Sequence, residues 1–177
     1  MTPGDRSTRP MSSTAISMSD SLTIRPATES DLPLLLQFIR DLADYEKLAH
    51  ECVADTGKLR AALFGPRPCA EALLGFAGDA PAAFAIFFQN FSTFLAKPGL
   101  YLEDLFVRPE FRRRGFGKAM LTHLAREANR RGCGRFEWAV LDWNRPAIDT
   151  YERFGAQVLP DWRICRLSGD ALARFGT

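Results

Sequence analysis

The sequence predicts a mixed α/β domain, in which a mostly antiparallel sheet with one parallel strand pair carries helices on both faces. The first observation is a hairpin signal, because two apolar strand-like segments flank the turn-forming residues 78–81. The second is an amphipathic helical pattern between the strand-like segments 100–107 and 135–140, which is the order of a β-α-β unit with parallel strands. The third is size, because 177 residues, 46% of them hydrophobic, suffice for one buried core.

The first half of the chain is expected to contain a strand, two helices and the hairpin. The first of these helices follows Pro26 and runs from Thr28 or Ser30, both cap-forming residue types, to about Tyr45. Its apolar residues recur at helical spacing: Leu32, Leu35, Leu36, Ile39, Leu42 and Ala43. The strand, the second helix and the two hairpin strands are expected at residues 21–25, 56–63, 70–74 and 82–89.

The second half alternates strands and helices. The pattern predicts a strand, a helix, a strand, a helix and one or two further strands, at residues 100–107, 117–131, 135–140, 146–154 and within 157–167. The first of these helices ends in Arg130, Arg131 and Gly132, the residue types that are common at a helix C-terminus.

Composition and charge restrict the kind of protein. Residues 1–20 are rich in Ser and Thr and predict a disordered tail, so residues 21–177 are expected to form a single domain. A net charge of +2 does not favour a nucleic-acid partner, and no apolar run approaches the ~20 residues that span a bilayer. The four cysteines form no C-x-x-C pair, which favours reduced thiols, no metal site and a cytoplasmic location.

The sharpest motif lies where the strand-like segment 100–107 ends and the helix 117–131 begins. Glycines there allow close backbone approach, and the unpaired N–H groups at a helix N-terminus attract phosphate. The candidate phosphate-binding residues are Arg112, Arg113, Arg114, Gly115, Phe116, Gly117 and Lys118. The alternative is a solvated basic turn. A dinucleotide fingerprint and a Walker A loop are both excluded, because Met120 and Ala119 stand where those motifs need Gly and Ser or Thr.

This R-x-x-G-x-G loop resembles the acetyl-CoA signature of the GNAT superfamily of N-acetyltransferases. Four further segments resemble its diamine acetyltransferase branch, which holds the spermidine/spermine and thialysine acetyltransferases: residues 24–28, 42–46, 101–107 and 139–144. The resemblance covers about residues 22–175. It implies the GNAT fold with the parallel pair at the cofactor cleft, acetyl-CoA as cosubstrate, and direct transfer of its acetyl group to the primary amine of a small molecule.

The resemblance also assigns roles to individual residues. It implies that the backbone of Leu105, Phe106 and Val107 binds the pantetheine arm and that the loop from Arg113 to Lys118 binds the pyrophosphate. Asn144 is implied as a further cofactor contact. The helical spacing of Tyr151 alone favours a core tyrosine, whereas the resemblance implies that it lies near the CoA sulfur as the general acid.

Glu103 is the candidate partner of the amine. Strand periodicity places Tyr101, Glu103 and Leu105 on one face, and a carboxylate there can bind an ammonium group and accept its proton. A satisfied ion pair or a solvated edge position is the alternative. The resemblance adds the other substrate-lining residues: Tyr45, Glu46, Glu137, Trp138 and Ala139.

The departures from the family pattern narrow the substrate. Thr93 and Leu95 stand where polyamine-acetylating members have an Asp and a Trp, so a thialysine-like amino acid or a short diamine is favoured over spermidine. Arg145 departs from the residue usual after Asn144. The resemblance further implies a homodimer, with Trp162-Arg163 matching the family. A non-catalytic acyl-CoA-binding regulator and a protein N-acetyltransferase are the alternative functions.

Overall fold

The computed structural model describes residues 21–176, and the tail predicted at residues 1–20 lies outside this range. Within it, the chain separates into two compact units, one ending at Trp138 and one beginning at Ala139. The two units are described in turn.

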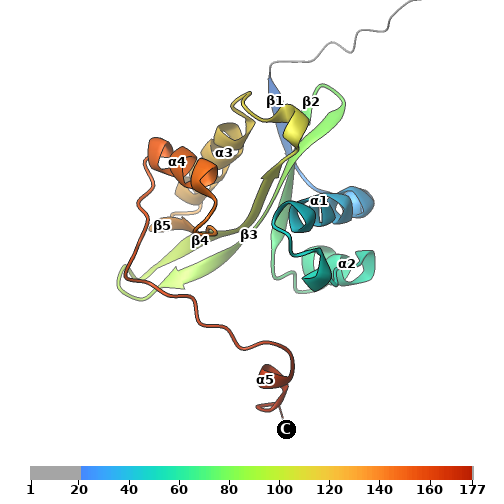
Figure 1. Ribbon diagram of the computed structural model, residues 1–177. Coiled ribbons are helices and arrows are strands. Elements are labelled where there is room, and N and C mark those ends of the chain that lie inside the picture. The colour runs from blue at the N-terminus through green and yellow to red at the C-terminus, as the bar shows by residue number, and fades with distance from the viewer. Residues whose placement is uncertain (1–20, 177) are drawn as a thin grey trace, which may run out of the picture. The chain divides into compact units, whose positions relative to one another are not determined.

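The first unit is built on a five-stranded sheet, whose strands lie side by side in chain order (Figure 1). The strands are β1 (Leu22–Pro26), β2 (Glu71–Ala77), β3 (Ala80–Ser92), β4 (Lys97–Val107) and β5 (Arg135–Trp138). Neighbours from β1 to β4 pair antiparallel, whereas β4 and β5 pair parallel. The predicted fold class, a mostly antiparallel sheet with one parallel pair, is confirmed.

Helices cover both faces of this sheet (Figure 1). α1 (Leu32–Tyr45) and α2 (Thr56–Phe64) lie on one face, and α3 (Phe116–Arg130) lies on the other. Short 3-10 turns precede α1, follow it and precede the α3 loop, at Glu29–Asp31, Ala49–Glu51 and Pro109–Phe111.

The core beneath α1 fixes that helix against the sheet. It is formed by buried side chains of α1, α2 and the central strands, among them Leu35, Phe38, Leu74, Phe84 and Phe106. The rings of Phe38 and Phe84 stack with centroids 5.3 Å apart. Since Phe106 belongs to β4, this packing sets where the end of α1 meets that strand.

A β-bulge interrupts β4 at Glu103. Asp104 pairs with Ile86, but the next residue of β3, Phe87, pairs with Leu102, so Glu103 is the extra residue. The expectation that Tyr101 and Leu105 share a face is therefore wrong. Their cross-strand partners, Phe88 and Ala85, are three residues apart on β3 and so point to opposite faces.

The second unit contains α4 (Arg145–Phe154) and the short helix α5 (Gly169–Ala173), which was not predicted. The strand or strands predicted within 157–167 are wrong, since the structure has no strand there. The segment is apolar enough for one, but a strand needs a neighbour for its backbone hydrogen bonds, and every residue from 157 to 167 is exposed. β5 likewise ends at Trp138, two residues before the predicted end.

Candidate functional site

The loop between β4 and α3 leads directly into the N-terminus of that helix. Arg113 and Gly115 both adopt left-handed conformations, with φ of 62° and 78°, which turns the chain sharply into α3. The first N–H groups of any helix have no intrahelical partner and form its positive end. At Gly117, a Cβ atom would meet only Val107, at 3.9 Å, so the space before this helix end is open.

The arginine side chains of this loop lie in different places. Arg114 lies over the rings of Phe111 and Phe116, 5.8 and 5.0 Å from their centroids, on the α3 side. Arg112 instead lies over Tyr45, at 4.5 Å, at the end of α1. Arg113 and Lys118 are exposed. The loop therefore does not direct all its predicted phosphate ligands to one point.

The open edge of β4 follows the bulge. Pairing with β5 ends at Leu102 and Trp138. From Glu103 to Val107, this edge of β4 has no strand partner among residues 21–176. Leu105, Phe106 and Val107, the predicted pantetheine-binding residues, all belong to this stretch, so their backbone can pair with an extended ligand as a strand would.

Three carboxylates form an acid cluster beside the bulge: Glu46, Glu103 and Asp104. Glu46 follows the last residue of α1, and Glu103 is exposed. Burial raises the pKa of Asp104 to about 6, with further contributions from the charges of Glu103 and Glu46. Burial also raises the pKa of Glu46. The contributions of Glu103 and Glu46 to the pKa of Asp104 show that the three negative charges lie close enough to interact, which suits a site for a cationic group.

Sequence reasoning missed Asp104. The residue pairs with Ile86, and both Ile86 and Phe106 belong to the core beneath α1, so the bulge turns Asp104 towards that face. The only available signal was a pair of adjacent carboxylates in an otherwise apolar strand. Regular alternation predicts that one of two neighbours faces the core, but it does not say which.

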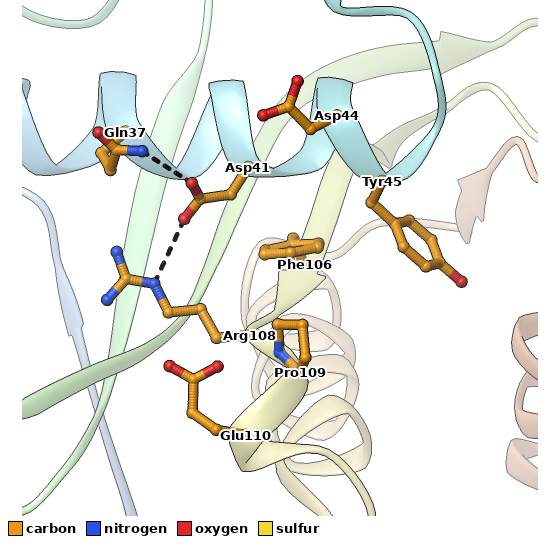
Figure 2. A pocket seen from close by; sticks show the side chains of 8 residues that line it. All are labelled: Gln37, Asp41, Asp44, Tyr45, Phe106, Arg108, Pro109 and Glu110. Carbon is orange, nitrogen blue, oxygen red and sulfur yellow. Dashed lines mark hydrogen bonds and ion pairs between the residues drawn. The ribbon is translucent and has the colours of Figure 1, made fainter.

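A groove of about 690 Å³ runs along α1 and is lined by Tyr45, the residue before Glu46 (Figure 2). Its walls include the rings of Tyr45 and Phe106, with centroids 6.1 Å apart, and three further carboxylates, those of Asp41, Asp44 and Glu110. Asp41 is tied to the opposite wall by Arg108, with Nε and Oδ2 3.4 Å apart. Asp44 and Glu110 make no ion pair with another described residue, so the groove is acidic and aromatic.

The predicted substrate residues of β5 are differently placed. Glu137 forms an ion pair with Arg135, with Oε2 2.8 Å from Nε, and accepts a hydrogen bond from Asn90 at 3.4 Å. Trp138 packs on Phe136, with ring centroids 4.8 Å apart. Because Arg135 neutralises it, Glu137 adds little negative charge to the site.

The remaining predicted residues belong to the second unit. Ala139 is exposed, and Asn144 immediately precedes α4. The carbonyl oxygen of Asn144 accepts hydrogen bonds from the N–H groups of Ala147 and Ile148, both at 3.1 Å, and so fixes the first turn. Tyr151 is half-buried, one turn beyond the buried Ile148. Among residues 21–176, no group of three or more His, Cys, Asp or Glu side chains is placed so that it could hold a metal ion.

No helix among residues 21–176 has the length and apolar character needed to cross a membrane.

Comparison with known sequences gives consistent matches. Residues 37–156 match the model of the acetyltransferase (GNAT) family. The chain is 36% identical to L-ornithine N5-acetyltransferase of Arabidopsis thaliana, over 84% of this chain and 85% of that protein. It is 35% identical to thialysine N-epsilon-acetyltransferase of Sus scrofa, over 86% of this chain and 95% of that protein.

Solved structures agree on the fold. An integron cassette protein from Vibrio cholerae superimposes with a TM-score of 0.74 at 22% identity, covering 88% of this chain and 98% of that one. An aminoglycoside acetyltransferase from a soil metagenome superimposes with a TM-score of 0.67 at 19% identity, covering 82% of this chain and 97% of that one. At such identities the likeness extends to the fold alone.

Proposed function

This chain belongs to the GNAT acetyltransferase family, and from this premise we propose that it transfers the acetyl group of acetyl-CoA directly to the primary amine of a small molecule. The observation that carries the proposal is the arrangement along β4. The strand bears two carboxylates at its bulge, exposes an unpaired backbone edge directly afterwards, and leads into the glycine-containing loop at the start of α3. One strand therefore offers a place for an amine, for an extended arm and for a pyrophosphate.

The donor would be held mainly by backbone. N–H groups of Gly115 to Lys118 would receive the pyrophosphate, with Arg113 and Lys118 supplying charge. The edge of β4 at Leu105 to Val107 would pair with the pantetheine arm. Asn144 is proposed as a further contact through the turn that it fixes.

The acid cluster would bind the amine and remove its proton. A primary ammonium group has a pKa near ~10.4 and is not nucleophilic until it is deprotonated. Glu103 and Asp104 would hold the ammonium and accept the proton, directly or through water. The neutral nitrogen then bonds to the thioester carbonyl carbon, the C–S bond breaks, and Tyr151 gives its proton to the departing thiolate. The nitrogen releases its extra proton to water, and Tyr151 regains a proton from water. No acyl-enzyme is involved.

The substrate class is inferred from the charges at the site and from the activities of the relatives. Glu46, Glu103 and Asp104 suit a single amine, while Thr93 and Leu95 supply no anion for the distal amine of a polyamine. The named activities of the relatives, on ornithine and thialysine, support a thialysine-like amino acid or short diamine.

We also propose a homodimer. The second unit exposes large apolar side chains, including Trp162, Ile164 and Leu167, which are 75%, 73% and 58% exposed. Exposed apolar residues gathered in one segment commonly mark a surface that another protein covers. The cytoplasmic location and the absence of a nucleic-acid partner stay predictions.

The mechanism is tested with two variants. Tyr151→Phe should lower kcat at least about tenfold, because thiolate protonation loses its donor, with acetyl-CoA affinity nearly unchanged. Glu103→Gln should lower kcat/KM for the amine by about tenfold or more, since the amine loses a charged partner. Steady-state thiol release measures both. A Tyr151→Phe kcat within about twofold of wild type at every pH would remove the general-acid role.

A further inference from the structure

Arg112 has an unexpected position for a residue of the glycine-containing loop. Its guanidinium carbon lies over two aromatic rings, 4.5 Å from the centroid of Tyr45 and 5.4 Å from that of Phe106. Its Nε donates a hydrogen bond to the carbonyl oxygen of Val107 at 3.0 Å. Three contacts thus hold the side chain beside the end of α1, among the candidate substrate residues.

These contacts leave the outer end of the guanidinium available. Nη1 and Nη2 of Arg112 make no hydrogen bond or ion pair with any other residue of the 21–176 range, and the residue as a whole is exposed. An arginine held on an aromatic surface loses little further conformational freedom on binding. Its two terminal nitrogens match the two oxygens of a carboxylate.

The surroundings favour a zwitterion over a phosphate as the ligand. The rings on which Arg112 lies also line the acidic groove along α1, where Asp44 is exposed (Figure 2). A dianionic phosphate would be repelled by the acid cluster and by this groove. An α-amino acid instead presents a carboxylate and an ammonium side by side, so that it can satisfy Arg112 and an acidic neighbour together.

We propose that the side chain of Arg112 binds the α-carboxylate of an amino-acid substrate and thereby selects amino acids over diamines of the same chain length. The inference rests on the proposed acetyl transfer to a small amine and narrows it. It also separates Arg112 from the loop residues that would serve the pyrophosphate, Arg113 and Lys118. The reaction itself is unchanged, because the carboxylate is bound at the end of the substrate remote from the amine that is acetylated.

A matched pair of substrates tests this assignment. Ornithine and putrescine share a four-carbon spacing between amines and differ in the α-carboxylate. The measured quantity is the ratio of kcat/KM for ornithine to kcat/KM for putrescine, using acetyl-CoA as donor. Effects on folding or on donor binding cancel in this ratio, since they act on both substrates equally. Lysine and cadaverine form a second pair.

Arg112→Gln should lower this ratio by about tenfold or more, because a charge-assisted, bidentate contact is lost for ornithine alone. Arg112→Lys should lower the ratio less, since lysine keeps the positive charge and loses only the bidentate geometry of the guanidinium. Arg113→Gln should lower kcat/KM for both substrates equally, because it weakens donor binding. Arg67 is exposed, and Arg67→Gln should leave kcat/KM for both substrates unchanged.

An unchanged ratio in Arg112→Gln overturns the assignment. If the same variant also has a raised KM for acetyl-CoA, Arg112 binds the pyrophosphate instead. Wild-type protein that binds CoA but acetylates neither these four amines nor thialysine would contradict the proposed function itself, and with it the inference. A wild-type enzyme that acetylates the diamines but neither amino acid leaves the proposed function standing and overturns the inference alone.

Discussion

Asp104 shows how the candidate site conflicts with folding stability at the level of a single residue. Burial and the neighbouring Glu103 and Glu46 raise its pKa from 3.8 to about 6. A raised pKa means that the folded protein disfavours the ionised form. The group therefore costs stability, and the cost grows as the pH rises from the unfolded-state pKa through the folded-state pKa.

Replacing Asp104 should make the protein more stable at high pH. Asp104→Asn keeps the shape and removes the charge, so at about pH 8 the free energy of unfolding should rise by on the order of 1–3 kcal/mol. The gain should shrink towards about pH 4, where the wild-type group is neutral in the folded state. Thermal unfolding at the two pH values measures the difference. Equal gains at both values would show that its charge is not the cause.

The same variant should lose activity. Without a titrating group beside Glu103, kcat/KM for the amine should fall by about tenfold or more, while CoA binding persists. A variant that is more stable and fully active would contradict the role given to Asp104.

At the level of elements, the two glycines at the start of α3 differ in the reason for which glycine is needed. Gly115 has a φ of 78° and open space where a Cβ would lie, so its requirement is conformational. Gly117 has no positive φ, and a Cβ there would meet only Val107 at ordinary contact distance. We therefore expect the need for glycine at position 117 to come from a ligand that approaches the helix end.

Two alanine substitutions should therefore behave oppositely. Gly115→Ala should lower the free energy of unfolding by about 1–2 kcal/mol, because an L-residue is strained in the left-handed region. Gly117→Ala should leave stability unchanged or raise it by up to about 1 kcal/mol, yet weaken CoA binding. Denaturant unfolding and CoA titration measure the two effects. Normal CoA affinity in Gly117→Ala would mean that the donor does not approach this position closely.

The elements also show how far sequence reasoning reaches. α1 and α3 end within one residue of their predicted ends, because their apolar residues keep helical spacing. The bulge at Glu103 was not predictable, since it exists only in the pairing of β4 with β3. For that reason the predicted face of Tyr101 and Leu105 was wrong and Asp104 was missed. The strands predicted within 157–167 failed because an apolar pattern does not reveal whether a partner strand is present.

For the molecule as a whole, family membership predicted from the loop 112–117 is confirmed, while the residue roles stay proposals. The motif could be predicted from the sequence because it is local: a strand end, two glycines and a helix start lie within one short segment. The side-chain positions of Arg112 and Arg114 could not be predicted, because the packing of Arg112 on Tyr45 and of Arg114 on Phe116 depends on the tertiary structure.

The proposed homodimer makes a prediction at this scale. Ile164→Asp, alone or with Trp162→Asp, should shift the protein from dimer to monomer in sedimentation velocity, since charge is placed in an apolar interface. Val53→Asp is the control, because Val53 is equally exposed, at 73%, but belongs to the first unit. A wild-type monomer at micromolar concentration, or a dimer that persists in the double variant, would contradict the interface.

The most direct test of the central claim is acetyl transfer by the purified wild-type chain. Acetyl-CoA is incubated with ornithine or thialysine, thiol release is followed, and mass spectrometry locates the acetyl group on the product. The expected result is amine-dependent thiol release, with the acetyl group on the side-chain nitrogen. Tight CoA binding without transfer to any small amine or short peptide would contradict the claim and identify a non-catalytic acyl-CoA-binding regulator instead.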